Sequence, residues 1–164
     1  MRHPRLALAC VAAMLSLAVT GCGFSPLYST AGYDRLAGLN VEAGPERFDY
    51  LLQDAVRGFA GPGVSPYSLS LSHEFRSRPL GISPTGEATR VSLQAVVRYE
   101  LIGPGDPIAG MRTADVTFDQ PGEPYALLAA RGEAEERLAR RMAEEIIQAV
   151  AVELRRREAG LSDR

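Results

Sequence analysis

The chain has 164 residues, a formal net charge of −2 at neutral pH, two cysteines and two histidines. All 18 basic residues are arginine, and 20 acidic residues outnumber them, so the excess of positive charge that is typical of nucleic-acid-binding proteins is absent. If the chain is cleaved before Cys22, the only remaining cysteine is lipidated and the only remaining histidine is His73, which excludes a disulfide framework and a Cys/His zinc site; we expect no metal and no cofactor.

The first 21 residues have the pattern of an export signal. Arg2 and Arg5 precede an uncharged, mostly apolar run at residues 6–19. This run is shorter than the roughly 20 residues that a membrane-spanning helix needs. We therefore interpret residues 1–21 as a signal peptide, with an uncleaved membrane helix as the alternative.

The segment Val19-Thr20-Gly21-Cys22 resembles the signal of bacterial lipoproteins, in which the cysteine is acylated and the chain is cleaved before it. Cys10 is the weaker candidate, because too few residues separate it from Arg5 to form an apolar core. Two or more acyl chains hold a protein stably on a membrane. Gly23 after the cysteine resembles an outer-membrane address, so we expect a lipid-anchored protein on the periplasmic side of the outer membrane.

Cleavage before Cys22 leaves enough residues for one domain with one hydrophobic core. The formal charge of this part is about −4, because the signal peptide contains Arg2 and Arg5 but no acidic residue. We expect a lipidated, extended tether at residues 22–37, a single domain at residues 38–158 and a short tail at residues 159–164.

Hydrophobic periodicity predicts six elements in the domain. Two segments have the 3.6-residue period of amphipathic helices, and four have the two-residue alternation of half-buried strands. A Pro- and Gly-containing loop is expected at residues 76–86. In chain order the predicted elements are a strand at 39–43, a helix at 46–59, strands at 67–76, 89–102 and 108–118, and a helix at 125–158.

Both predicted helices show a buried face and a solvated face. On the long helix, opposite charges four residues apart predict the ion pairs Glu133 with Arg137 and Glu136 with Arg140. On the first helix, the apolar face predicted to be buried consists of Phe48, Leu51, Leu52, Ala55, Val56 and Phe59.

The element order predicts an α+β fold. We expect a two-layer sandwich in which a four-stranded mixed sheet packs on two helices in the order βαβββα. Because both helices would cover the same face, the other face of the sheet is left over for contacts.

No catalytic arrangement is evident. His73 is the only histidine after processing, and it lies in an alternating strand without a G-x-S-x-G motif, so we interpret it as a sheet-face histidine. Glu144 and Glu145 are adjacent on a helix and point in different directions, which makes a poor catalytic pair. We therefore expect a protein that is not an enzyme; a lipid-anchored periplasmic hydrolase using His73 is an alternative.

The sequence Cys22-Gly23-Phe24-Ser25-Pro26-Leu27-Tyr28, followed by this element order, resembles the LPS-assembly lipoprotein family, LptE. The resemblance implies a plug inside the large outer-membrane barrel that inserts lipopolysaccharide. It also implies help with barrel assembly, lipopolysaccharide binding and no catalysis. An accessory lipoprotein of a lipid-trafficking ABC transporter is the alternative.

Lipopolysaccharide carries phosphates and carboxylates, which arginine binds in a bidentate manner. Five arginines flank the predicted loop or lie on the last two strands. As a hypothesis, we assign a ligand-facing patch to Arg76, Arg78, Arg90, Arg98 and Arg112.

Overall fold

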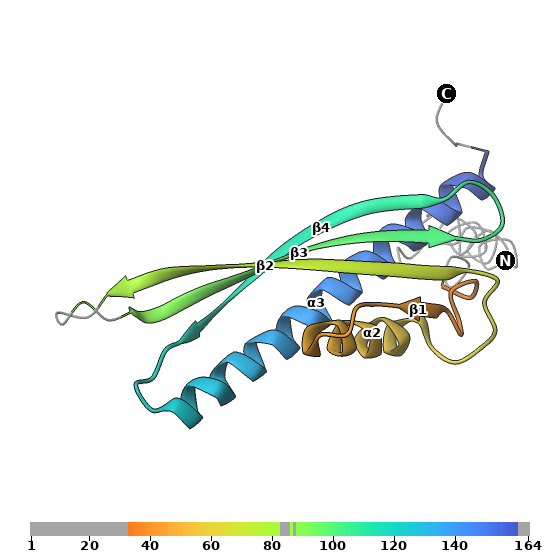
Figure 1. The fold of residues 1–164 in the computed structure, drawn as a ribbon. Helices are drawn as coiled ribbons and strands as arrows, with labels where there is room; N and C mark the ends of the chain where they lie inside the picture. The colour runs from red at the N-terminus through yellow and green to blue at the C-terminus, as the bar shows by residue number, and fades with distance from the viewer. Residues whose placement is uncertain (1–32, 83–85, 87, 161–164) are drawn as a thin grey trace, which may run out of the picture. The chain divides into compact units, whose positions relative to one another are not determined.

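The computed structural model describes residues 33–82, 86 and 88–160, which form two layers (Figure 1). A four-stranded sheet is one layer, and two helices on one of its faces are the other. This confirms the predicted α+β fold and its βαβββα order; the expected signal peptide and Cys22 lie outside the described residues. In chain order the elements are β1 (Asn40–Glu42), α2 (Arg47–Ala60), β2 (Ser68–Ile82), β3 (Ala88–Ile102), β4 (Ile108–Asp119) and α3 (Pro124–Glu158).

The strands lie in the sheet in the order in which they occur in the sequence. β1 runs parallel to β2, because α2 connects them, and the β2–β3 and β3–β4 pairs are antiparallel. Leu69 lies opposite Leu101, and Ala95 lies opposite Ala114. The odd-numbered residues of β3 and the even-numbered residues of β4 therefore face the helices, as the alternation in the sequence predicts.

β2 is longer than predicted. The loop expected at residues 76–86 is wrong for residues 76–82, which continue the strand and pair with the start of β3. The register shifts between Pro79 and Gly81 and again at Ile82. Beyond Ser70, β2 pairs with no other described strand on the β1 side, and proline is tolerated on such an edge. Residues 76–82 and 88–92 form a β2–β3 arm that projects past the helices (Figure 1).

The hydrophobic core lies between the sheet and the helices. At the start of α2 the Glu46 N–H donates to Asp49 Oδ2 at 3.1 Å, in the arrangement of a capping box. Phe59 was predicted to be buried but is 43% exposed, and Ala60 takes the buried position at the end of α2. Burying a large apolar side chain contributes roughly 1.5–3 kcal/mol. The largest fully buried side chains are Leu36, Val41, Phe48, Leu52, Val56, Leu69, Leu93, Leu101, Leu138, Met142, Ile146 and Ile147.

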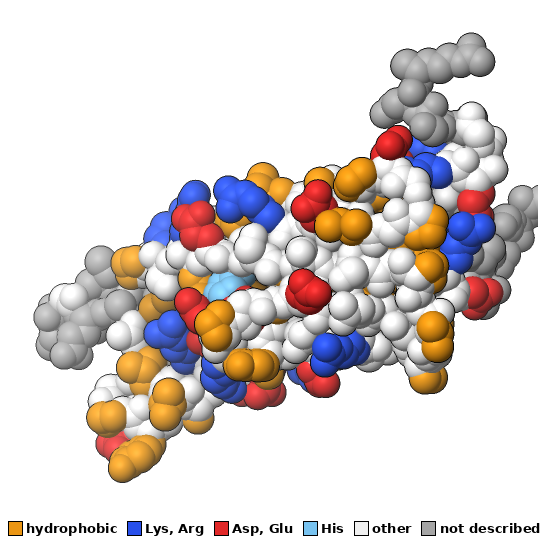
Figure 2. Space-filling model, turned by 45° about the vertical axis from the view of Figure 1, so that its right-hand side comes forward, with side chains coloured by type: hydrophobic (Ala, Val, Ile, Leu, Met, Phe, Trp, Pro, Cys, Tyr) orange, Lys and Arg blue, Asp and Glu red, His pale blue; other side chains and the backbone are white. Residues whose placement is uncertain are grey.

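α3 extends over 35 residues and begins one residue before its predicted start. Its buried side chains repeat at intervals of three and four residues from Ala134 to Leu154. Its first turns are apolar but uncovered, with Tyr125 83% and Leu128 70% exposed, and they give the hydrophobic surface at the lower left of Figure 2. In the described part of the chain, no helix is both long enough and apolar enough to cross a membrane.

Ion pairs on α3 partly follow the prediction. Arg137 Nη1 lies 2.7 Å from Glu133 Oε1, as expected for a pair four residues apart. Glu136 instead accepts from Arg47 on α2, at 3.5 Å. Arg47 also lies 2.8 Å from Glu135, whose side chain is only 9% exposed. These contacts fix the start of α2 against α3.

Residues 33–38, most of which we assigned to an extended tether, instead form turns that pack on the domain. Leu36 is fully buried, and the Gly38 N–H donates to the Gly61 carbonyl at 2.9 Å. Gly38 has a φ of +76°, and a Cβ built on it would collide with the Gly63 carbonyl. The close approach of these two backbone segments therefore requires glycine.

The two ends of the described domain lie side by side. Arg35 Nη2 is 2.5 Å from Glu158 Oε1 near the end of α3. The Arg35 carbonyl also accepts from the Ser65 hydroxyl at 2.7 Å, which connects this end to the segment before β2. The β2–β3 arm is at the opposite end of the domain (Figure 1).

Candidate functional site

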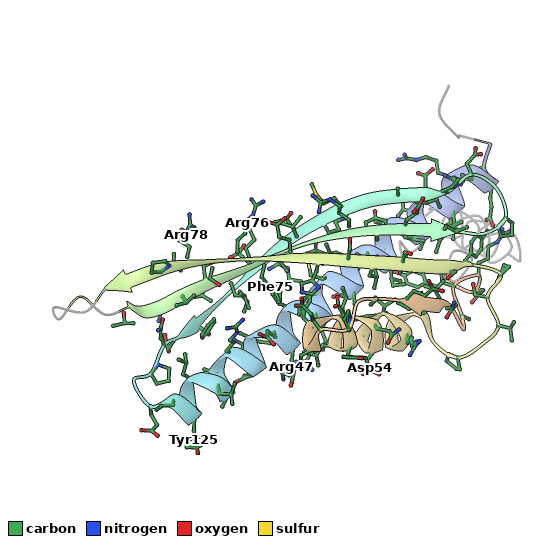
Figure 3. The ribbon with its side chains drawn as sticks, viewed as in Figure 1. Arg47, Asp54, Phe75, Arg76, Arg78 and Tyr125 are labelled. Carbon is green, nitrogen blue, oxygen red and sulfur yellow. The ribbon has the colours of Figure 1, made fainter. Side chains whose placement is uncertain are left out.

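Four of the five predicted ligand-binding arginines lie on the sheet face that α2 and α3 leave uncovered, which we call the open face. Arg76 and Arg78 are on β2, and Arg90 and Arg98 are on β3, all with exposed side chains. Figure 3 shows Arg76 and Arg78 on the side of the ribbon away from the helices. The two-residue alternation of the strands accounts for this shared face.

The strand register brings three of these arginines together. Arg78 lies opposite Ser92, and Arg90 is two residues before Ser92, on the same face of β3. Residues in such diagonal positions are about 7–8 Å apart, which long side chains can span. Arg76, Arg78 and Arg90 therefore form an arm cluster. Arg98 lies opposite Ser72, four residues from Arg76 along the strand direction, or about 13 Å, and it lies outside the cluster.

Two members of the arm cluster already pair with carboxylates. Arg76 Nη2 lies 3.2 Å from Glu74 Oε1, and Arg90 Nε lies 3.1 Å from Asp119 Oδ1, all on exposed side chains. Exposed pairs contribute only about 0–1 kcal/mol, so an anionic ligand can replace these carboxylates at little cost. Arg78 makes no ion pair with any described residue.

Arg112 lies on the other face of the sheet. It is opposite Val97 and faces the helices, with its guanidinium carbon 5.8 Å from the centre of the Tyr99 ring. Its Nη1 donates to the Met111 carbonyl at 2.9 Å. Arg112 is therefore not a member of the arm cluster. The sequence contained the signal, because Arg112 is in phase with the buried Ala114.

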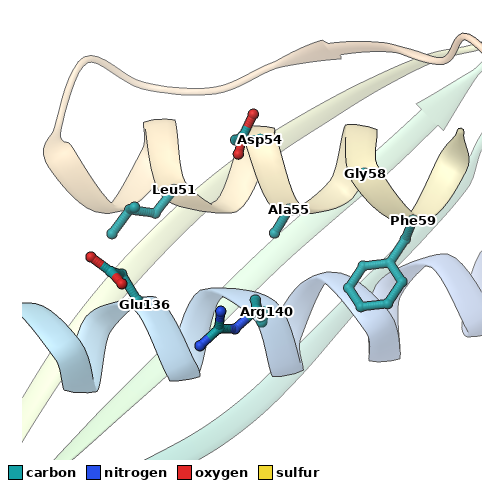
Figure 4. A pocket seen from close by; sticks show the side chains of 7 residues that line it. All are labelled: Leu51, Asp54, Ala55, Gly58, Phe59, Glu136 and Arg140. Carbon is teal, nitrogen blue, oxygen red and sulfur yellow. The ribbon is translucent and has the colours of Figure 1, made fainter. Parts of the chain in front are cut away.

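A groove that the sequence analysis did not identify lies between α2 and α3 (Figure 4). It has a volume of about 410 Å³ and combines apolar side chains with charges at its sides. Such a groove fits an apolar side chain flanked by polar groups. Its lining residues are Leu51, Asp54, Ala55, Gly58, Phe59, Glu136 and Arg140.

His73 faces the helices from β2, as predicted for a sheet-face histidine. Its Nδ1 is 2.6 Å from Asp49 Oδ1, and its Nε2 is 3.5 Å from Glu46 Oε2. The His73 side chain is 7% exposed, and the rings of Phe48 and Phe75 lie 4.9 Å from its ring centre. The pair links β2 to the start of α2. Nowhere in the described residues do three His, Cys, Asp or Glu side chains come close enough to hold a metal ion.

Several solved structures of bacterial lipoproteins are similar to this chain. A protein of Caulobacter crescentus described as a lipoprotein has a TM-score of 0.64 and 26% identity, covering 76% of this chain and 95% of its own. The rare lipoprotein B of Shewanella oneidensis has a TM-score of 0.47 and 15% identity, covering 75% and 97%. A search of curated proteins returned no match.

The match to a protein family is more direct. The family model described as "LptE: Lipopolysaccharide-assembly" matches residues 34–150, which includes all four strands, α2 and most of α3. A match over this much of the sequence identifies the family from the whole domain, independently of the segment around Cys22. The chain therefore belongs to the LptE family of lipopolysaccharide-assembly proteins.

Proposed function

We propose that this protein plugs the outer-membrane barrel of the lipopolysaccharide translocon and helps that barrel to assemble. The observation that carries the proposal is the open face. Because both helices pack on one side of the sheet, three long strands present polar and charged side chains on the other side. The helices already bury one face of the sheet. The open face can therefore lie against a barrel wall without disturbing the hydrophobic core.

Copurification from detergent-solubilised outer membrane tests the plug. We expect a large, heat-modifiable barrel to be retained with the affinity-tagged protein, because the contact surface of the open face is extensive. Retention of ABC-transporter subunits in place of a barrel would support the accessory-lipoprotein alternative and contradict the proposal.

We propose that Cys22 carries the lipid anchor on the periplasmic side of the outer membrane. Cys22 lies outside the described residues, so the proposal is supported by the sequence around it. Several acyl chains on one residue give the stable membrane attachment that a single chain lacks. Mass spectrometry of the mature N-terminus is expected to find an acylated cysteine, and a free thiol there would contradict this assignment.

The arm cluster is the proposed contact with lipopolysaccharide. Arg76, Arg78 and Arg90 present three guanidinium groups on one exposed surface, and guanidinium matches the geometry of phosphate. Arg98 is on the same face but apart, and Arg112 is on the other face, so neither is assigned to this contact.

We expect the triple substitution of Arg76, Arg78 and Arg90 by alanine to weaken lipopolysaccharide binding at least tenfold. Each charge-assisted hydrogen bond contributes roughly 1.5–3 kcal/mol, part of which is offset by release of the paired carboxylates. The matched control replaces Arg137, Arg141 and Arg156, which also pair with glutamates but lie on α3. Equal binding by the two triple variants would contradict the assignment.

The protein is proposed to act by binding, without catalysis. A hydrolase built on His73 would need that side chain to reach a substrate, but it is buried and paired with Asp49. Loss of a measured hydrolytic activity in His73→Ala, with the fold intact, would contradict this proposal.

A further inference from the structure

The backbone hydrogen bonds show which groups of β4 point away from β3. The Gln120 N–H donates to the Thr89 carbonyl at 2.9 Å, and bonded pairs alternate along an antiparallel ladder. The even-numbered residues of β4 therefore bond to β3, and the odd-numbered residues point outward. The contact between Arg112 and the Met111 carbonyl agrees, because that carbonyl is accessible only from the outer side.

β4 is an edge strand, and no other strand of the described residues lies beyond it. From Thr113 to Thr117, its outward N–H and C=O groups have no hydrogen-bond partner among the described residues. Thr113, Asp115 and Thr117 are all exposed. Three alternate residues thus present an ordered row of free donors and acceptors, which is the template for adding another strand.

In the part of the sheet that the structure describes, the other edges lack such a row. β1 has only three residues, and its Val41 carbonyl accepts from Gln53 at 2.5 Å and from Arg57 at 3.3 Å. The free part of β2 contains Pro79 and two register shifts, features that discourage strand addition. β4 pairs with β3 in unbroken register and has no proline.

We propose that β4 pairs through its outer edge with an extended segment of the barrel partner. The inference rests on the proposed function, and it names the surface through which the plug is held. The occupant has a defined chemistry, because side chains of an added strand alternate between the two faces. The added strand carries a basic residue beside Asp115, which has no cationic partner among the described residues. Beside the half-buried Val116 and Phe118 the added strand carries apolar residues.

Substitution of Thr113 and Thr117 by proline tests the row directly. Proline removes the outward N–H groups but leaves the bonds to β3, since those come from even-numbered residues. We expect the double proline variant to retain at least tenfold less barrel in copurification than the wild type. The control Thr113→Val/Thr117→Val keeps the backbone donors and is expected to retain the barrel normally. Equal retention by the proline variant, with the wild type binding, would overturn the edge proposal alone.

Amide hydrogen exchange gives a second measurement that needs no variant. In the complex with the barrel, the amides of Thr113, Asp115 and Thr117 are expected to exchange at least tenfold more slowly than in the free protein. Unchanged exchange would overturn the proposal. The proposal would also be overturned if the wild type formed a homodimer and the double proline variant were a monomer. Failure of the wild type to retain any barrel would contradict the proposed function itself.

Discussion

Substitution of Gly38 by alanine is expected to destabilise the domain by about 2–5 kcal/mol. The φ of +76° puts a residue with a Cβ in the left-handed region, at about 1–2 kcal/mol, and the collision with the Gly63 carbonyl adds roughly 1–3 kcal/mol of overpacking. The backbone has little freedom to shift, because Leu36 and Leu39 on either side are buried. Urea denaturation followed by circular dichroism measures the loss.

Gly58→Ala is the matched control for this prediction. Gly58 lies in α2, and a Cβ built on it meets no atom within 4 Å. Alanine favours a helix over glycine by up to about 1 kcal/mol, so this variant is expected to be more stable than the wild type. If Gly38→Ala unfolded at the same urea concentration as the wild type, the close approach of the two backbone segments would be wrong.

His73→Leu is expected to reduce the free energy of unfolding by about 3 kcal/mol. Leucine preserves most of the apolar packing against Phe48 and Phe75 but leaves the buried Asp49 carboxylate without its partner. Leaving a buried group without its hydrogen-bond partner costs roughly 1–3 kcal/mol, and more for a charged group. A loss of about 3 kcal/mol is expected here, because the Asp49 carboxylate loses its partner on the ring but still accepts from the Glu46 N–H.

Combining His73→Leu with Asp49→Asn separates charge from packing. Asparagine can accept the same backbone hydrogen bond without a charge, so the double variant is expected to recover at least about 1 kcal/mol relative to His73→Leu. A double variant that is less stable than His73→Leu would show that packing around the ring, rather than the unpaired carboxylate, sets the cost.

Element types could be predicted from the sequence because the core dictates a simple alternation. On β3, Leu93, Ala95 and Val97 face the helices, and the intervening residues do not. The length of β2 could not be predicted, since Pro79 and Gly81 read locally as a loop, whereas pairing with the regular β3 holds them in a strand. Long-range pairing therefore outweighed the local preference of these two residues.

The candidate site could be predicted only in part. Alternation assigned Arg76 and Arg78 to the open face, but it does not reveal which arginines meet across strands. That depends on the register, which brings Arg90 near Arg78 and places Arg98 opposite Ser72, away from both. The groove was missed because helical periodicity assigned Leu51, Ala55 and Phe59 to the buried face, whereas they line the groove. The apolar side chains of α2 that are buried are Phe48, Leu52, Val56 and Ala60.

The contact between Arg35 and Glu158 has a practical consequence for engineering. Because the described domain starts and finishes at one place, a short loop joining these ends would make a circular permutant with new termini elsewhere in the chain. A reporter protein fused behind α3 would lie at the end of the domain where Arg35 and Glu158 meet. The β2–β3 arm, at the far end, would stay free of such a cargo.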